Sequence, residues 1–238
     1  MSNTAIWHDV ECGAYSADLG LWEEMARRAG GPVLELGCGT GRVSLHLARR
    51  GHSVVGLDLD PDLLAVLGER GAGLDIETVE ADACEFELRR PVALALAPMQ
   101  VLQLLDDSIE RQECLACVAA ALAPGGRFAA AIIERMPEEV DAPPPLPDVH
   151  DIDGWIYSSL SIEAAVGPGE IIIRRLRQTV SPGGELSEEP NEIRIATFEA
   201  AQLEAEAAAA GLVPIRRLEI PPTDIHVGST VVVLGKEG

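Results

Sequence analysis

One stretch, residues 33–41, limits what this chain can fold into. It reads VLELGCGTG, an apolar run that passes into Gly37, Gly39 and Gly41 and is followed by a helical pattern over residues 41–51. A strand, a glycine turn and a helix in this order let the backbone approach a ligand closely, and the helix N-terminus supplies free N–H groups. The stretch therefore predicts a binding loop for a nucleotide-like cofactor.

Strand-like and helical patterns continue to alternate as far as about residue 133. Apolar runs typical of strands and amphipathic runs typical of helices follow one another at 53–58, 61–71, 76–81, 92–99, 108–122 and 125–133. Near-continuous apolar strands separated by helices favour a parallel sheet that is covered on both faces. The expected fold class is α/β, with a doubly wound, mostly parallel sheet.

The pattern changes after residue 134, where a proline-rich loop is expected at 137–147. Runs rich in β-branched and aromatic residues then predict antiparallel strands, at 154–162, 170–180 and 191–197. The rest of the chain reads as a helix and two closing strands of the main sheet, at 198–211, 212–220 and 229–235. Thr197 is the expected cap of that helix. We therefore expect one domain that carries an inserted antiparallel β subdomain.

The charge and the cysteines exclude several classes of protein. With 18 basic and 39 acidic residues the formal net charge is −21, whereas a nucleic-acid binder needs clustered Lys and Arg. The same charge disfavours an anionic membrane surface, and no apolar run approaches the roughly 20 residues that span a bilayer. Nothing at the N-terminus directs export, so the cytoplasm is the expected compartment. The five cysteines are expected to be free thiols, with no metal site.

The spacing of the glycines decides between cofactors. A dinucleotide fingerprint needs G-x-G-x-x-G, but counting from Gly37 places Arg42 at the sixth position, with Gly41 one position early. Asp58 ends the second strand, where a carboxylate can accept hydrogen bonds from a ribose diol, and Asp82 follows the third strand, where it can accept from an adenine amine. These positions favour an adenosine-containing cofactor other than NAD.

Together these stretches resemble the class I S-adenosylmethionine-dependent methyltransferases, of the type that acts on small molecules. The matching segments are VLELGCGTGRVSLHLARRG, VVGLDLDPDLLAVL, VEADAC, VALALAPMQVLQLL and LAPGGRFAAAI, which cover roughly residues 30–133 in the order of the family. The resemblance implies a seven-stranded sheet with an antiparallel last strand. It also implies four parts of one methyltransferase domain: an N-terminal cap segment, a cofactor-binding core, inserted substrate-binding strands and a closing part, at 1–29, 30–133, 134–197 and 198–238.

The resemblance further implies S-adenosyl-L-methionine as cofactor and S-adenosyl-L-homocysteine as product. The residues that would bind it are Tyr15, Glu35, Gly37, Cys38, Gly39, Asp58, Leu59, Asp82, Ala83 and Ala97. Glu35 and the glycine backbone would line the methionine end, Asp58 would hold the ribose with Leu59 against the adenine, Asp82 and Ala83 would cap the base, and the backbone of Ala97 would face the sulfonium. Structural roles stay open for three acids: Glu35 could bond loop amides, Asp58 could cap a helix, and Asp82 could form a turn.

The sequence says less about the acceptor. Ala97-Pro98-Met99-Gln100 replaces the Asn/Asp-Pro-Pro-aromatic motif common in nucleic-acid methyltransferases, so we expect a small-molecule acceptor that is methylated on an amine or hydroxyl. Gln103 is expected beside the methyl group, although many relatives carry a histidine there and Gln cannot act as a base. His150 is a candidate base and Tyr157 a candidate pocket residue, whereas His226 is expected to be structural. The alternatives are a non-catalytic S-adenosylmethionine-binding subunit or sensor, and a homodimer is possible.

Overall fold

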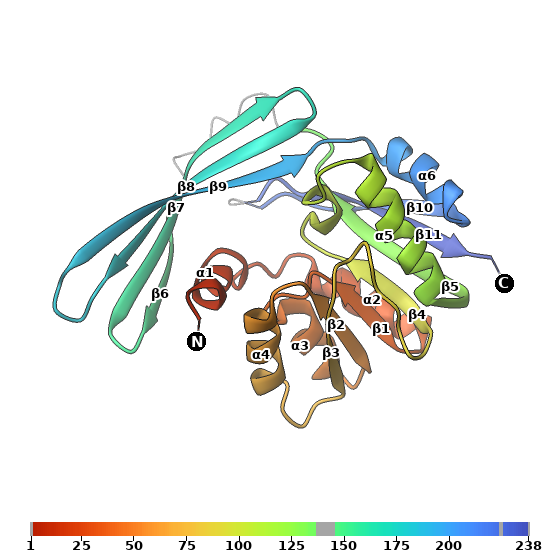
Figure 1. Ribbon diagram of the computed structural model, residues 1–238, viewed down its shortest axis with the longest axis horizontal. Helices are drawn as coiled ribbons and strands as arrows, with labels where there is room; N and C mark the ends of the chain where they lie inside the picture. Colours follow the sequence, from red (N-terminus) through yellow and green to blue (C-terminus); the bar gives the residue numbers. More distant parts are fainter. Residues whose placement is uncertain (1, 137–145, 224–225, 238) are drawn as a thin grey trace.

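The computed structural model describes residues 2–136, 146–223 and 226–237. These residues form a seven-stranded sheet with helices on both faces and a separate four-stranded antiparallel sheet (Figure 1). The predicted α/β class, with an inserted antiparallel subdomain, is confirmed.

The main sheet has the strand order β10-β11-β5-β4-β1-β2-β3. Its parallel strands are β1 (Val33–Leu36), β2 (Val54–Asp58), β3 (Ile76–Glu80), β4 (Val92–Ala97) and β5 (Leu122–Ile132). β11 (Ser229–Lys236) runs antiparallel to both β5 and β10 (Leu212–Ile220), as the resemblance implied. The chain passes from β1 outward to β2 and β3 and then returns to β4 on the other side of β1, and ligands bind at such a switch point, outside the carboxyl ends of the strands.

Helices cover the two faces of this sheet because the apolar side chains of each strand alternate between them. The helices are α1 (Asn3–Cys12), α2 (Leu19–Ala29), α3 (Arg42–Ala48), α4 (Pro61–Arg70), α5 (Ser108–Ala121) and α6 (Ala200–Ala209), with a 3₁₀ turn at Val101–Gln103. Leu34 and Leu36 of β1 pack in one cluster with residues of α5 and α6, and Val33 packs in another with residues of α2 and α3. None of the described helices has both the length and the apolar content needed to cross a bilayer.

The expected cap of α6 is wrong. Its N-cap residue is Glu199, whose side chain makes no capping bond, and the backbone N–H of Ala200 donates instead to Oε1 of Glu134 at 2.7 Å. Thr197 donates its own N–H to the carbonyl of Gly169. A carboxylate from a distant part of the chain thus satisfies the helix terminus, which no local pattern could indicate.

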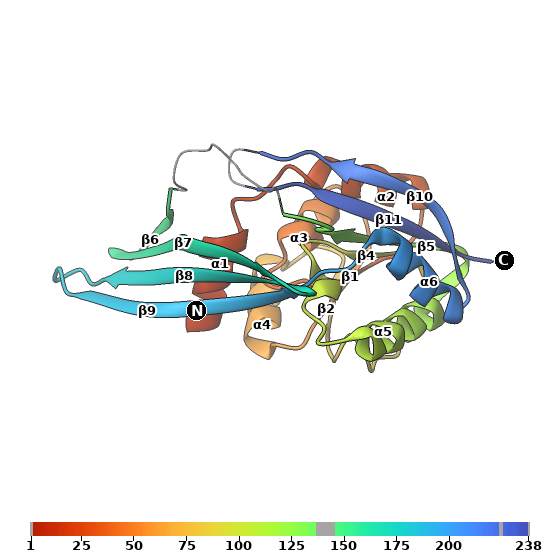
Figure 2. The ribbon, with the colours of Figure 1, turned by 90° about the horizontal axis from the view of Figure 1, so that it is seen from above.

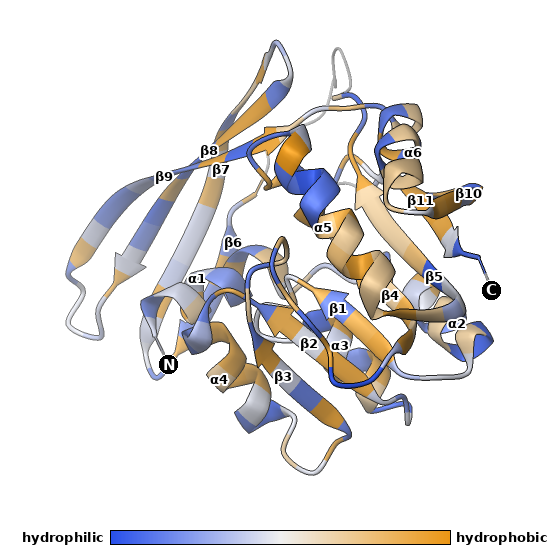
Figure 3. Ribbon diagram, turned by 45° about the vertical axis from the view of Figure 1, so that its right-hand side comes forward, coloured by the Kyte–Doolittle hydropathy of each residue, from blue (hydrophilic) through white to orange (hydrophobic). Residues whose placement is uncertain are grey.

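The insertion is a sheet of four antiparallel strands that extends away from the main sheet (Figure 2). The strands are β6 (Asp148–Ile152), β7 (Trp155–Gly167), β8 (Glu170–Val180) and β9 (Leu186–Ala196). β7 and β9 are longer than predicted, β6 was not predicted, and most of the predicted proline-rich loop lies outside the described residues. The insertion strands alternate between hydrophilic and hydrophobic positions, whereas β4 is mainly hydrophobic (Figure 3), because each face of the insertion meets a different environment.

The helix α1 lies between the two sheets and contacts the insertion (Figure 1). Glu11 accepts hydrogen bonds from Nε and Nη2 of Arg177 at 2.8 and 2.9 Å, and from the hydroxyl of Ser159 at 2.8 Å. Trp7 packs edge-on against Tyr157 with ring centroids 5.5 Å apart. The N-terminal segment is therefore a fixed part of the fold that supports one face of the insertion.

A buried ion pair fixes α2 against α3. Both oxygens of Asp18, whose exposed fraction is 1%, accept from Arg42 at 2.6 and 2.7 Å, and Oδ2 also accepts from Nε1 of Trp22 at 2.8 Å. This bidentate pair joins the start of α2 to the first turn of the helix that follows the glycine loop.

We predict that Asp18→Ala lowers the free energy of unfolding by about 3–5 kcal/mol, because it leaves the Arg42 guanidinium buried without its counter-ion. Urea denaturation of both proteins measures the difference. The matched control is Arg174→Ala, which removes exposed ion pairs with Glu163 and Glu192 and should cost no more than about 1 kcal/mol. Equal losses in the two variants would contradict the prediction.

Candidate active site

The predicted cofactor residues of the core gather at one edge of the main sheet. They follow the carboxyl ends of four neighbouring strands, with Ala97 on β4, Glu35 and the glycine loop on β1, Asp58 and Leu59 on β2, and Asp82 and Ala83 after β3. Because parallel strands end at the same edge, positions far apart in the chain become neighbours. This edge is the candidate active site.

The glycine loop is tightly enclosed. Gly37 and Gly39 have positive φ values of 58° and 54°, and a Cβ on Gly39 would lie 2.1 Å from Nε2 of His8 in α1. A Cβ on Gly37 would lie 2.8 Å from a methyl group of Val101, in the turn after β4. Both the backbone conformation and the close approach of neighbouring side chains therefore require glycine.

The carboxylate of Asp58 holds this loop. Its Oδ2 accepts from the N–H of Gly39 at 2.7 Å and its Oδ1 from the N–H of Asp60 at 3.0 Å. The alternative that Asp58 caps α4 is wrong, because the N-cap residue is Asp60, which accepts from the N–H of Asp62 at 2.8 Å. Asp58 thus bonds loop amides, which is the structural role that the sequence left open for Glu35. It also lies at the end of β2, the position predicted for the ribose.

Two of the three positions assigned to the adenine lie at the surface. Leu59 is 69% exposed, which is unusual for a leucine directly after a buried strand and leaves an apolar side chain available to a flat ring. Asp82 is exposed as well, and its Oδ1 accepts from the N–H of Cys84 at 2.8 Å. The turn-forming role of Asp82 is confirmed, and this role leaves its carboxylate at the exit of β3.

Glu35 is buried, and its ionisation is strongly altered. Burial raises the pKa of its carboxyl to about 8, although a hydrogen bond from Ser44 of α3 acts in the opposite direction. At neutral pH the carboxyl is therefore mostly protonated, and a cation placed beside it would favour the charged form. Ser44 was missed at the sequence level because a serine inside a helix carries no signal for its partner.

The exit of β4 contains two non-glycine residues in the left-handed region. Met99 has φ 48° and Gln100 has φ 62°, and Nε2 of Gln100 donates to the hydroxyl of Ser229 at 2.9 Å. Non-glycine residues in this conformation cost free energy, and such backbone is concentrated at functional sites. Neither residue type favours a positive φ, so this conformation could not be predicted from the sequence.

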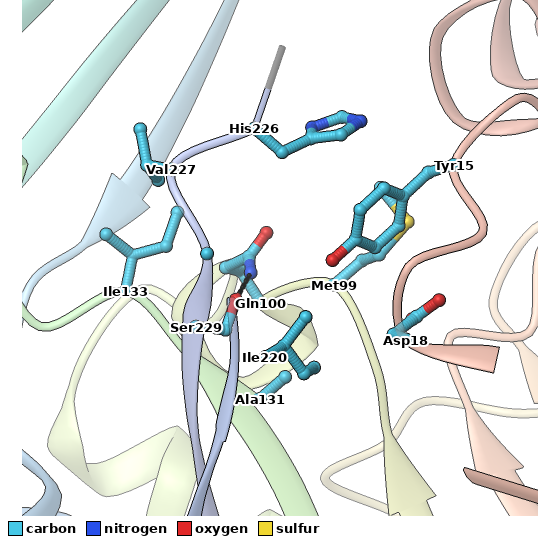
Figure 4. A pocket seen from close by; sticks show the side chains of 11 residues that line it. Tyr15, Asp18, Met99, Gln100, Ala131, Ile133, Ile220, His226, Val227 and Ser229 are labelled. Atoms are coloured by element: carbon cyan, nitrogen blue, oxygen red, sulfur yellow. Dashed lines mark hydrogen bonds between the residues drawn. The ribbon is translucent and has the colours of Figure 1, made fainter. Parts of the chain in front are cut away.

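A cavity of ≈ 50 Å³ opens beside these two residues (Figure 4). It is lined by side chains from the N-terminal segment, the ends of β4 and β5 and the segment before β11, namely Tyr15, Asp18, Met99, Gln100, Ala131, Ile133, Ile220, His226, Val227, Gly228 and Ser229. A second cavity, of ≈ 240 Å³, shares five of these residues: Ile133, Ile220, Val227, Gly228 and Ser229. A space lined by both polar and apolar side chains therefore adjoins the candidate cofactor edge.

His226 lines this cavity, so the expectation that it has only a structural role is incomplete. Its ring lies edge-on to Tyr15 with centroids 4.2 Å apart, and Figure 4 shows both side chains at the same opening. Burial lowers the pKa of His226 from its usual value, so the imidazole is neutral at pH 7. The guanidinium carbon of Arg42 lies 5.1 Å from the ring centroid of Tyr15. Because Arg42 belongs to α3, this contact links the cavity to that helix.

The predicted position of Gln103 beside the reacting methyl is not supported. Its side chain is 1% exposed; Nε2 donates to the carbonyls of Ile133 and Ala196 at 3.0 and 2.6 Å, and Oε1 accepts from the N–H of Ile133 at 2.6 Å. Gln103 therefore joins the ends of β5 and β9 to the turn after β4. Its role is to position the insertion on the core.

His150 and Tyr157 lie opposite each other on β6 and β7. Neither is among the described residues that line the ≈ 50 Å³ cavity, and Tyr157 packs on Trp7 as an ordinary strand tyrosine would. The candidate base at this edge is therefore His226 rather than His150. Among the described residues, no group of three or more His, Cys, Asp or Glu is placed to hold a metal ion.

A family model matches the part of the chain that contains the candidate cofactor edge. Residues 33–126 match the family model described as "Methyltransferase domain". These residues form a methyltransferase domain. The match covers the glycine loop and the predicted positions from Glu35 to Ala97, so the resemblance drawn from the sequence is confirmed.

Relatives of this methyltransferase domain include a curated protein and two solved structures. An S-adenosyl-L-methionine-dependent Diels-Alderase of Talaromyces variabilis is 32% identical over 116 residues, which are 48% of this chain and 40% of that protein. An amino pentose methyltransferase of Micromonospora echinaspora, solved with S-adenosylmethionine bound, has a TM-score of 0.74 at 20% identity and covers 99% of this chain and 98% of its own. A sugar N-methyltransferase of Streptoalloteichus has a TM-score of 0.80 at 18% identity, with coverage of 100% and 94%. The chain spans about half the length of the curated relatives it matches, and the structures establish the fold alone.

We predict that Gln103→Leu lowers the free energy of unfolding by about 1–3 kcal/mol for each backbone group of Ile133 and Ala196 that it leaves buried and unpaired. Chemical denaturation measures the loss. Gln100→Leu removes a single side-chain bond, to Ser229, and is the matched control with an expected loss of about 1 kcal/mol. A smaller effect for Gln103→Leu than for the control would contradict its positioning role.

Proposed function

We propose that this chain transfers the methyl group of S-adenosyl-L-methionine to an amine or hydroxyl of a small molecule. The observation that carries the proposal is the meeting of two sites at one sheet edge. The predicted cofactor residues follow β4, β1, β2 and β3, and the cavity of Tyr15 and His226 lies at the adjoining ends of β4 and β5. The two sites adjoin at this edge, as transfer of a group from one ligand to another requires.

The names of the similar structures support the same class of reaction. One is an amino pentose methyltransferase with bound S-adenosylmethionine and the other a sugar N-methyltransferase, and each covers nearly the whole chain. Both names describe small-molecule acceptors, the first an amino sugar, and the second names nitrogen as the methylated atom. We therefore place an amine before a hydroxyl as the acceptor group.

The reaction needs alignment more than chemical activation. The acceptor lone pair attacks the methyl carbon in line with the breaking carbon–sulfur bond, and the leaving sulfur keeps the bonding electrons. The acceptor gains a positive charge, which it loses with a proton. The neutral imidazole of His226 is the group we assign to receive that proton, because it is half-buried, faces the cavity and has a lowered pKa.

The chain's own residues would hold the cofactor by their chemistry. Asp58 offers carboxylate oxygens to the ribose hydroxyls while it fixes the N–H of Gly39, and Glu35 offers a carboxyl to the ammonium at the methionine end. Leu59 would cover one face of the adenine, and Asp82 with Ala83 would meet its edge. The ring of His8 covers Gly39, so α1 would shield the reacting atoms from water.

A second function is favoured by one comparison. A relative over 48% of the chain is an S-adenosyl-L-methionine-dependent Diels-Alderase, a name that describes use of the cofactor without mention of methyl transfer. This agrees with the alternative of a cofactor-binding protein that does not methylate. Incubation with S-adenosylmethionine and a pool of small amines and alcohols separates the two, because only methyl transfer produces S-adenosylhomocysteine. The cytoplasmic location and the homodimer stay predictions.

We predict that S-adenosylmethionine and S-adenosylhomocysteine bind, whereas NADH does not. Asp58→Ala should weaken S-adenosylhomocysteine binding by about 1.5–3 kcal/mol for each charge-assisted bond lost. Titration calorimetry measures the affinities. Asp62→Ala, which changes an exposed carboxylate in the first turn of the neighbouring helix, should leave them unchanged. Binding of NADH alone, or equal affinity in both variants, would rule out this cofactor site.

We also predict that cofactor binding releases a proton from Glu35 below pH 8. The buried carboxyl has a pKa of about 8, so it is protonated at pH 7 and loses its proton when the ammonium of the cofactor favours the carboxylate. Affinity should therefore rise between pH 6 and pH 8 and level off above that. Calorimetry at pH 7 in buffers of different ionisation enthalpy counts the protons. Glu35→Gln should abolish the release; an unchanged count in that variant would assign the proton elsewhere.

A further inference from the structure

The cavity of ≈ 240 Å³ adjoins the smaller cavity that contains His226. The two share five lining residues, and one of these, Val227, directly follows His226 in the chain (Figure 4). The smaller cavity, of ≈ 50 Å³, has room for only a few water-sized groups, because a single water molecule needs about 10–15 Å³ of such space. An acceptor larger than this, with its reacting group beside His226, would therefore have its remaining atoms in the larger cavity.

Two carboxylates line the larger cavity, and one of them is free. Glu219, near the end of β10, pairs with Thr230 of β11 in antiparallel register, which places both side chains on the same face of the sheet. The hydroxyl of Thr230 donates to Glu134, the other acid of this cavity, at 2.7 Å. The side chain of Glu219 is exposed, and no hydrogen bond or ion pair joins it to another of the described residues. Glu219 therefore keeps its full capacity to accept hydrogen bonds.

The basic residues nearby are held by other acids. Arg135, which lines the larger cavity, donates from Nη2 to Glu199 at 2.7 Å. Arg217, two positions before Glu219 on β10, donates to both oxygens of Glu204, at 2.8 and 2.7 Å. Neither guanidinium is bonded to Glu219, so the negative charge of its carboxylate is available to a ligand.

The smaller cavity differs in charge. Its acidic residue is Asp18, and both oxygens of that carboxylate accept from Arg42, at 2.6 and 2.7 Å. The imidazole of His226 is neutral at pH 7, because burial lowers its pKa. A positive charge is therefore stabilised in the larger cavity, beside Glu219, and not in the smaller one.

We infer that the acceptor is a compound with two amino groups, which binds with one amine beside His226 and the second, as an ammonium, on Glu219. An ammonium donates charge-assisted hydrogen bonds to a carboxylate, and the net charge of −21 attracts such a compound as it diffuses toward the protein. The inference rests on the proposed function, since it names the class of acceptor for that reaction.

The difference in charge between the two cavities then decides which nitrogen is methylated. Only a neutral amine has the lone pair that attacks the methyl carbon, so the nitrogen beside His226 gives one proton to solvent before the transfer. After the transfer that nitrogen is positively charged, and it gives a second proton to the imidazole of His226. The nitrogen on Glu219 stays protonated and does not react.

The test compares probe amines that differ only at the second end of the chain: 1,5-diaminopentane, pentylamine and 5-aminopentanol, together with the corresponding butyl and hexyl compounds. Their binding to the full chain saturated with S-adenosylhomocysteine is measured by saturation-transfer NMR. We expect at least one diamine to bind about fivefold more tightly than the monoamine and the amino alcohol of the same length, which is the upper range for an ion pair that water reaches. Equal binding of diamine and monoamine at every length, no binding of any diamine, or tighter binding of the amino alcohols would overturn the inference.

Substitutions then assign the preference to one carboxylate. Glu219→Gln should reduce the preference for the diamine to less than about twofold, because it removes the charge and keeps the size of the side chain. Glu77→Gln is the matched control, since Glu77 is an exposed acid on β3, at the opposite edge of the same sheet from β10. The control loses the same net charge and should keep the full preference. A preference that survives in Glu219→Gln, or falls equally in both variants, would overturn the assignment.

S-adenosylhomocysteine affinity separates this inference from the proposed function. Both variants should bind the cofactor product as the wild-type protein does, which also shows that they are folded. Failure of the wild-type protein to bind it would refute the proposed function, whereas normal binding without a preference for any diamine would refute only the role of Glu219 and the diamine acceptor.

Discussion

Two carboxylates on opposite faces of α1 connect the parts of this protein. Asp9 and Glu11 are two residues apart, which places them about 200° apart around a helix. Asp9 faces the core, where it accepts from the hydroxyl of Thr40 at 2.6 Å and pairs with Arg70, while Glu11 faces the insertion and pairs with Arg177. Burial would raise the pKa of each acid, but the hydrogen bonds from arginine and hydroxyl groups lower it, so both stay charged.

The position of the insertion follows from this arrangement. α1 supports its inner face through Glu11, and Gln103 holds its last strand through the carbonyl of Ala196. The same helix places His8 on the glycine loop, within 3.2 Å of the hydroxyl of Thr40. A movement of the insertion would therefore also displace the loop that we assign to the cofactor, because one rigid helix contacts both.

The active-site edge combines rigid and strained elements. Asp18, Arg42 and Tyr15 form a continuous set of contacts from α3 to His226, and Met99 and Gln100 hold a left-handed backbone between the cofactor edge and the cavity. Groups fixed in this way need little reorganisation when a ligand arrives, which is what an alignment-driven methyl transfer requires. Burial disfavours the charged form of both side chains, which leaves the imidazole of His226 neutral and the carboxyl of Glu35 protonated.

The α/β class, the strand and helix order and the glycine loop could be predicted from local patterns, because periodicities of 2 and 3.6 residues and the φ of glycine act over a few neighbouring positions. The strand ends that bring Glu35, Asp58 and Asp82 together followed from the family's strand order. Which side chains meet depends on the folded arrangement: Gln103 bonds to groups 30 and 93 residues away, and His226 contacts Tyr15 from the other end of the chain. Such partners are chosen by how the layers pack, and packing over these separations leaves no periodic signal in the sequence.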